Sequence, residues 1–230
     1  MKLKEDHHGH RKRVKDKFLK DSANFTDYEL LELFLFASHS RKDVKPLAKK
    51  LLAKFGSISS FLKADCESLK NFPDVNNNVL VSLKLIKEII TRSSKQQIMH
   101  KPIIASWRQL CDYCQIVMAN LKEEQFRILF LDKKHHLIAD ELIKSGGIEE
   151  VEIDIKTIVK KSLNFSATSI ILMHNHPNLD CKPSRNDIAN TKTISSTLQT
   201  LGIIVNDHLI IGDNDQIFSF KNESLLDTIS

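Results

Sequence analysis

The sequence has little of what marks several protein classes. Only 6 Gly and 5 Pro occur in 230 residues, which argues against a low-complexity or fibrous chain. No run approaches the roughly 20 consecutive apolar residues that a membrane span needs. The first 20 residues are basic but lack the apolar segment of a secretory signal. We therefore expect a cytoplasmic protein with no membrane partner.

Cysteine is also scarce, with four residues in the whole chain. Without an export signal, these are expected to be reduced thiols. Cys111 and Cys114 have the spacing of a zinc or redox pair. However, they fall within a predicted amphipathic helix and no second cysteine pair exists, so we interpret them as buried thiols.

The charge is unevenly distributed along the chain. Residues 1–20 carry eight Lys and Arg against three Asp and Glu, which accounts for the whole net charge of +5. Such a segment could contact phosphate groups, although most charge runs are simply solvated. The remaining composition, 41% hydrophobic and 27% charged, is typical of a globular protein.

The pattern of apolar residues divides the chain into parts. Residues 1–20 are predicted to form a basic flexible arm, and residues 21–92 a helical domain in which Thr26 or Asp27 caps a buried helix and Gly56 ends another. Residues 93–101 are polar and unpatterned, which predicts a linker. Residues 102–230 form the second predicted domain.

The second domain alternates predicted strands and helices. Helices are expected at 107–121, 153–163 and 184–201, and strands at 126–131, 136–143 and 169–176. A final hairpin is expected to pair 208–211 with 216–220 through a turn at 212–215. The pattern predicts an α/β or α+β domain preceded by a small helical one.

The main chemical signal is His174-Asn-His176-Pro177, followed after six residues by Ser184 and then Asp187. Two histidines two positions apart on a strand point to the same side, so their imidazoles can share one metal ion. Asp187 would lie in the first turn of the next helix and add an oxygen ligand. Two nitrogens and one oxygen leave a fourth position for water, as in catalytic zinc sites. The alternative is that Ser184 and Asp187 form only an ordinary helix cap.

This pattern, His-x-His-Pro-x6-Ser-x2-Asp, resembles the JAMM motif of MPN+ metalloproteases, and the whole chain resembles the RadC family. Further matching stretches are Gly9–Arg11, 27–33, 43–49, 55–57, 124–132 and 207–212. The resemblance implies an α+β fold: a JAMM/MPN (cytidine-deaminase-like) mixed β-sheet with flanking helices, preceded by a small all-α domain.

The resemblance also implies a function and roles for residues. One zinc ion per chain would be held by His174, His176 and Asp187, and a zinc-activated water would attack a peptide or isopeptide-type amide bond in a protein or peptide substrate. A glutamate at the start of the first strand would act as general base and acid. Glu124 has that position, with Glu123 as the alternative. Ser184 would donate a hydrogen bond to the water or the developing oxyanion.

The N-terminal part resembles a helix-hairpin-helix module, which binds DNA backbone through glycine-rich turns. Here the sequence 73–78, Pro-Asp-Val-Asn-Asn-Asn, replaces the usual glycines, so DNA binding through this region is less favoured than a structural or partner-binding role. The competing interpretation is a DNA repair or recombination protein whose metal site is structural or inactive. A zinc nucleobase deaminase is excluded because the chain lacks His-x-Glu with a later Pro-Cys-x-x-Cys. Asp207 and His208 are expected to support a ligand or to be structural, and the oligomeric state stays open.

Overall fold

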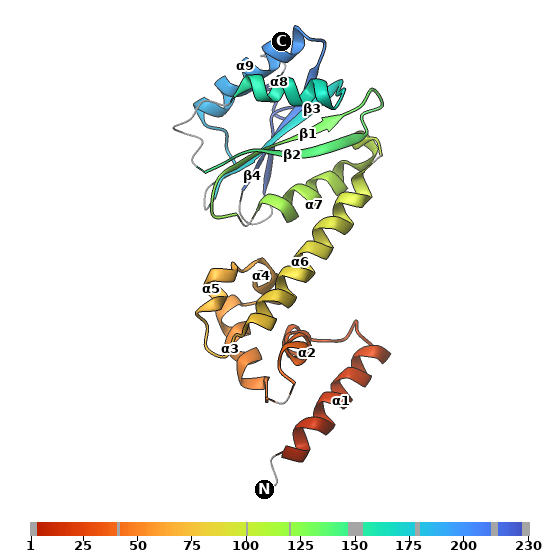
Figure 1. Ribbon diagram of the computed structural model, residues 1–230, viewed down its shortest axis with the longest axis vertical. Coiled ribbons are helices and arrows are strands. Elements are labelled where there is room, and N and C mark those ends of the chain that lie inside the picture. The colour runs from red at the N-terminus through yellow and green to blue at the C-terminus, as the bar shows by residue number, and fades with distance from the viewer. Residues whose placement is uncertain are drawn as a thin grey trace. The chain divides into compact units, whose positions relative to one another are not determined.

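A computed structural model of the chain describes residues 4–40, 42–99, 101–119, 121–146, 154–177, 180–212 and 216–226. The chain divides into two compact units, Met1–Ile89 and Ile90–Ser230 (Figure 1). Helix α6 (Asn77–Ile98) contributes residues to both units. Residues 93–98, predicted as part of a linker, therefore continue a helix. They contain neither Gly nor Pro, so nothing in their backbone chemistry interrupts it.

In the part of the chain that the structure describes, the first unit is helical. Besides the start of α6 it contains α1 (Lys4–Lys20), α2 (Asp27–Ser38), α3 (Lys45–Phe55), α4 (Ile58–Lys63) and α5 (Cys66–Lys70). Side chains cap α2, α4 and α5: Thr26, Ser57 and Asp65 each accept a hydrogen bond from a backbone N–H of the first turn. Gly56 ends α3 with a φ of +80°, in the left-handed region that glycine tolerates.

Helix α1 is where this unit differs from the sequence prediction. We expected residues 1–20 to form a flexible arm, but Lys4–Lys20 is a helix. Arg11 donates hydrogen bonds to the carbonyl oxygens of Ser40 and Lys42 at 3.0 and 2.5 Å. Val14 packs against the apolar core of the unit. These partners lie far along the chain, so the local charge pattern could not reveal them.

Within its described residues, the second unit contains a five-stranded mixed sheet in the order β2-β1-β3-β4-β5. The strands are β1 (Gln125–Leu131), β2 (Leu137–Ser145), β3 (Ser169–Asn175), β4 (Ile204–Ile211) and β5 (Ile217–Ser219). β1 runs antiparallel to β2 and β3, β3 runs parallel to β4, and β4 runs antiparallel to β5. The predicted α+β class with a mixed sheet is confirmed. Residues 213–215, in the predicted hairpin turn, lie outside the described residues.

Helices cover both faces of this sheet (Figure 1). One face packs against α7 (Trp107–Met118), which follows a short 3-10 turn at Ile103–Ser106. The other face packs against α8 (Ile155–Asn164) and α9 (Arg185–Gln199). Each face therefore has its own apolar core, and every residue of the central strand β3 is buried between them.

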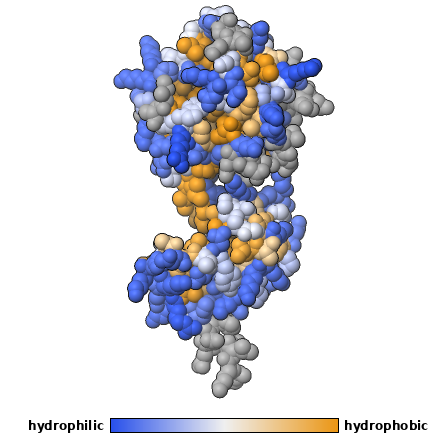
Figure 2. Space-filling model, turned by 180° about the vertical axis from the view of Figure 1, so that it is seen from behind, coloured by the Kyte–Doolittle hydropathy of each residue, from blue (hydrophilic) through white to orange (hydrophobic). Residues whose placement is uncertain are grey.

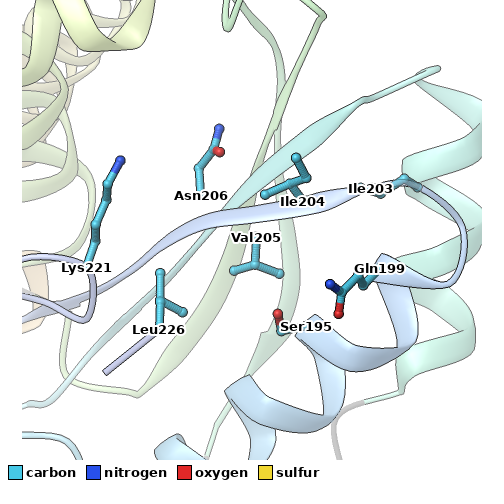
Figure 3. Close-up of a pocket in the computed structure, with 8 residues that line it drawn as sticks. All are labelled: Ser195, Gln199, Ile203, Ile204, Val205, Asn206, Lys221 and Leu226. Carbon is cyan, nitrogen blue, oxygen red and sulfur yellow. The ribbon is translucent and has the colours of Figure 1, made fainter. Parts of the chain in front are cut away.

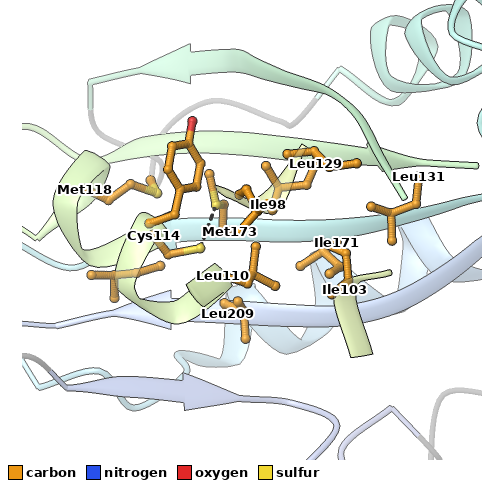
Figure 4. Packing of buried hydrophobic residues seen from close by; sticks show 13 residues of the cluster. Ile98, Ile103, Leu110, Cys114, Met118, Leu129, Leu131, Ile171, Met173 and Leu209 are labelled. Atoms are coloured by element: carbon orange, nitrogen blue, oxygen red, sulfur yellow. Dashed lines mark hydrogen bonds between the residues drawn. The ribbon is translucent and has the colours of Figure 1, made fainter. Parts of the chain in front are cut away.

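Alternate residues of β3 point to opposite faces, as strand geometry requires. Ile171 and Met173 belong to the core under α7 (Figure 4). Ile170 and Leu172 belong to the core under α8 and α9. The same alternation turns His174 toward the face that α9 covers.

Among the described residues, helix α6 carries an exposed apolar row. Val81, Leu85 and Ile89 are 64%, 57% and 57% exposed and follow one another at four-residue spacing. In Figure 2, exposed hydrophobic residues appear as orange patches on a mostly blue surface. Among the described residues, no helix combines the length and apolar character needed to cross a bilayer.

A candidate metal centre at the end of β3

Two imidazoles meet where β3 ends. His174 is the second-last residue of the strand, and His176 follows immediately after it. Their Nε2 atoms lie 2.9 Å apart. His174 is 1% exposed, whereas the side chain of His176 is 12% exposed, so one ring is buried and the other reaches the rim of the site.

Asp187 joins this pair from the first turn of α9. Its Oδ1 lies 3.3 Å from Nε2 of His174, and its Oδ2 lies 3.5 Å from Nε2 of His176. Ser184 orients the carboxylate through a capping box: its N–H donates to Oδ2 of Asp187 at 2.7 Å, and its Oγ accepts from the Asp187 N–H at 3.1 Å. The capping interpretation of Ser184 and Asp187 is therefore confirmed, and the cap leaves the Asp187 carboxylate beside both imidazoles, so the two interpretations are compatible.

Glu124 approaches the imidazole pair from the position directly before β1. A ligand atom of Glu124 and one from each histidine all lie within 4.8 Å of one another. The antiparallel register pairs Phe126 with His174. Two residues before Phe126, the chain therefore comes opposite His176, on the same side of the sheet. Glu123 is turned elsewhere, and its carboxylate accepts a hydrogen bond from the Ser145 hydroxyl at 3.3 Å.

The hydrogen bonds around His176 determine which of its nitrogens carries hydrogen. Its Nδ1 lies 3.0 Å from the carbonyl oxygen of Asp180, which can only accept. Nδ1 is therefore the donor, and in the neutral ring Nε2 presents a lone pair to His174 and Asp187.

A longer chain of hydrogen bonds determines which nitrogen of His174 carries hydrogen. The Thr191 hydroxyl donates to the carbonyl oxygen of Asp187 at 2.6 Å, so its oxygen must accept from Nδ1 of His208, also at 2.6 Å. Nε2 of His208 is then the acceptor for Nδ1–H of His174 at 2.8 Å. Nε2 of His174 is left with a lone pair as well.

These tautomers test whether the residues fit a metal ion. In these neutral tautomers, two imidazole nitrogens 2.9 Å apart cannot hydrogen-bond to each other, and their lone pairs repel unless a proton or a metal cation lies beside them. Two neutral imidazoles and a carboxylate match the nitrogen and oxygen ligands that zinc takes in catalytic sites. The residues therefore fit a divalent cation. The structure brings the predicted ligands together, and their role as ligands stays a prediction.

The electrostatics agree with this arrangement. Burial alone would raise the pKa of the Asp187 carboxyl, but its contacts with His174 and His176 outweigh that effect and hold the pKa well below its usual range. The contact with Asp187 raises the pKa of His176, against partial burial, which lowers it. Burial, together with the nearby His174, lowers the pKa of His208 well below its ordinary value, so that ring is neutral.

Two side chains that surround the centre were not predicted from the sequence. Thr191 is fully buried and could have been noticed, because it follows Asp187 by four positions on one face of α9. Asn175, between the two histidines, has no local signal. His208 supports His174 directly. Its neighbour Asp207 has a structural role, because its carboxylate accepts hydrogen bonds from the hydroxyl of Ser219 and the backbone N–H groups of His208 and Lys221.

Other candidate features lie outside the centre. Both cysteines lie on α7: Cys114 is buried and Cys111 is half-buried, and both are free thiols. A pocket of about 280 Å³ lies at the start of β4 (Figure 3). It is lined by Ser195, Gln199, Ile203, Ile204, Val205, Asn206, Lys221 and Leu226. The pocket includes none of the residues around His174, so it takes no part in this site.

The mixed sheet, its flanking helices and the histidine–aspartate cluster at the end of its central strand define a domain of the JAB/MPN class. A family model described as a RadC-like JAB domain matches residues 104–225, which is more than half of the chain. The chain belongs to the RadC-like JAB domain family.

Proposed function

We propose that this chain is a zinc-dependent hydrolase of peptide or isopeptide-type amide bonds, with His174, His176 and Asp187 holding one zinc ion. The observation that carries the proposal is the pair of Nε2 atoms 2.9 Å apart, both close to the Asp187 carboxylate. When bound, zinc supplies the Lewis acidity that makes water a usable nucleophile near neutral pH.

Glu124 is the proton carrier in this proposal. Amide hydrolysis requires a group that takes a proton from the attacking water and delivers one to the leaving amine. The Glu124 carboxylate lies near both histidines, yet it is only half-buried, so water and substrate can reach it. Ser184 has the second role in this chemistry. Its hydroxyl oxygen accepts a hydrogen bond in the helix cap, which leaves the hydroxyl hydrogen free to be donated to the oxygen on which negative charge develops.

Metal analysis tests the first part of the proposal. Purified protein should contain one zinc ion per chain by mass spectrometry, and His174→Ala should lose it. His136→Ala is a matched control, because His136 lies in the same unit but pairs with Asp132. A zinc content that His174→Ala leaves unchanged would contradict the assignment.

Activity tests the second part, with a panel of internally quenched peptides and isopeptide-linked peptides as probes. Glu124→Gln should retain zinc and lose about 100- to 10,000-fold in kcat, the range expected for a general base. Glu123→Gln, one position away, should stay close to the parent. A parent protein that contains zinc and hydrolyses nothing in the panel would overturn the proposed activity.

An alternative function, DNA binding by the N-terminal region, is favoured by one observation. Lys12, Arg13, Lys15 and Lys20 are exposed on α1. The expected hairpin turn offers less, because Asp74 occupies its left-handed position at φ +69° with a carboxylate bonded to Lys42. An acidic group there repels phosphate, so any DNA contact would come from α1.

Fluorescence anisotropy with duplex and junction DNA distinguishes this alternative. Binding through phosphate contacts should weaken steeply as salt rises. Replacing Lys12 and Arg13 by Glu should weaken it further, whereas Lys49→Glu on α3 should not. Absence of binding at low salt would remove this alternative.

A further inference from the structure

The residue between the two histidines makes a pair of hydrogen bonds to the segment that carries Glu124. Asn175 is 2% exposed. Its Nδ2 donates to the carbonyl oxygen of Glu123 at 3.1 Å, and its Oδ1 accepts from the N–H of Gln125 at 2.8 Å. One side-chain amide therefore binds the two peptide groups that flank Glu124.

These bonds replace backbone pairing where it stops. The ladder between β1 and β3 ends at the pair Phe126 and His174. The backbone of Asn175 pairs instead with Ile211 of β4. On the other side, the N–H of Gly146 donates to the carbonyl oxygen of Glu124 at 2.9 Å. Glu124 is thus held beyond the end of the ladder by Asn175 of β3 and by Gly146, which directly follows β2.

An asparagine side chain suits this position because it offers one donor and one acceptor in a fixed plane. Aspartate would lose the donor and place its charge against the carbonyl oxygen of Glu123. Alanine would leave that carbonyl and the N–H of Gln125 without this partner in a partly buried place, which disfavours the present geometry.

We infer that Asn175 is a positioning residue, which holds Glu124 in register with the imidazoles of His174 and His176. The inference rests on the proposed function, which assigns Glu124 the proton transfer. The segment His174-Asn175-His176 supplies two of the proposed ligands, and its middle residue also holds Glu124. The proposed ligands and the general base are therefore positioned by the same three residues. Catalytic groups require such support, because a displacement of about 1 Å can cost about 100-fold in rate.

A double-mutant cycle on the full chain tests whether Asn175 acts through Glu124. Asn175→Ala should keep one zinc per chain and lower kcat on the peptide panel by about 100-fold, with little change in KM. In a Glu124→Gln background, the same substitution should cost no more than about 2-fold, since the group it positions is already disabled. An equal loss in both backgrounds would overturn the inference.

Matched variants separate positioning from general stability. Asn206→Ala also removes a half-buried amide from this sheet, one that bonds Ser169 and His135, and it should leave kcat unchanged. Asn175→Asp keeps the acceptor and loses the donor, and should also lower kcat. It serves as the test if the alanine variant folds poorly.

A crystal structure of zinc-loaded Asn175→Ala decides the matter without an activity assay. We expect Glu124 to move away from the histidines while His174, His176 and Asp187 stay in place. If the parent hydrolyses nothing, the proposed function fails, but the position of Glu124 still supports or refutes the inference. An unmoved Glu124 would refute it.

Discussion

Nε2 of His208 lies 2.8 Å from Nδ1 of His174, and both rings are buried. Through this contact and the Thr191 hydroxyl, Nδ1 of His174 is held as a hydrogen-bond donor. In the neutral ring, Nε2 of His174 then carries a lone pair. Partners of this kind tune a metal ligand without touching the ion.

Removing this support should weaken metal binding. Thr191→Val keeps the shape of the side chain and deletes the hydroxyl, so the tautomer of His208 is no longer specified. We expect zinc affinity, measured by competition with a chromogenic chelator, to fall about 10- to 100-fold. Thr191→Ser restores the hydroxyl and should restore affinity. Equal affinities in the parent and in Thr191→Val would show that the hydroxyl has no such role.

Ser184 should have two separable effects. Ser184→Ala removes a helix cap, which costs about 1 kcal/mol in the free energy of unfolding. It should also lower kcat about 100- to 1,000-fold if the hydroxyl stabilises the developing charge. Ser57→Ala removes the cap of α4 and should show only the stability effect. Urea unfolding measures the stability effect, and peptide hydrolysis measures the effect on kcat. If Ser184→Ala and Ser57→Ala have equal kcat, Ser184 acts only as a helix cap.

The buried carboxylate of Asp140 should be important for stability. It accepts two hydrogen bonds from Arg127 at 3.0 Å and one from the phenol of Tyr113. Burial, with Asp140 nearby, raises the pKa of Tyr113, so the phenol keeps its proton. Asp140→Ala leaves Arg127 unpaired and should cost about 3–5 kcal/mol. Glu141 lies on the same strand as Asp140 and forms a half-exposed pair with Lys161 of α8. Glu141→Ala should therefore cost at most about 1 kcal/mol.

In the metal-free protein, the contribution of His176 to stability should be lost as pH rises. The pKa of His176 is raised in the folded state by Asp187, so the protonated ring stabilises folding. That contribution is complete below the unfolded pKa and is lost as pH rises through the folded pKa. Thermal unfolding of zinc-free protein between about pH 6 and pH 9 should show this decline, and His176→Gln should reduce it. A zinc-free parent with the same pH profile as His176→Gln would contradict the assignment.

Local patterns were enough to predict several parts of the molecule. The apolar run before His174 indicated a buried strand, and the two-residue period placed both histidines on one side of it. The serine and aspartate spacing indicated a helix start at Ser184, and the structure has its capping box there. These features depend on residues within a few positions of one another, which is why the sequence reveals them.

Other parts depended on contacts between distant residues. The helix at Lys4–Lys20 is stabilised by carbonyl groups near Ser40, and a charge run alone does not indicate such a partner. The polar residues 93–98 had the composition of a linker, yet they continue α6. In both places the sequence was polar enough for a loop. Distant partners hold the first helix, whereas the second continues because its residues contain no Gly or Pro to interrupt it.

By itself, the sequence determined that two imidazoles and a carboxylate would sit at a strand end and a helix start, because strand and helix periods act over short range. Only the tertiary structure decided that Glu124 comes opposite His176, that Asn175 binds its flanking peptides, and that His208 and Thr191 orient His174. Those relationships arise from pairing between strands and packing of α9, which join residues 17 to 52 positions apart.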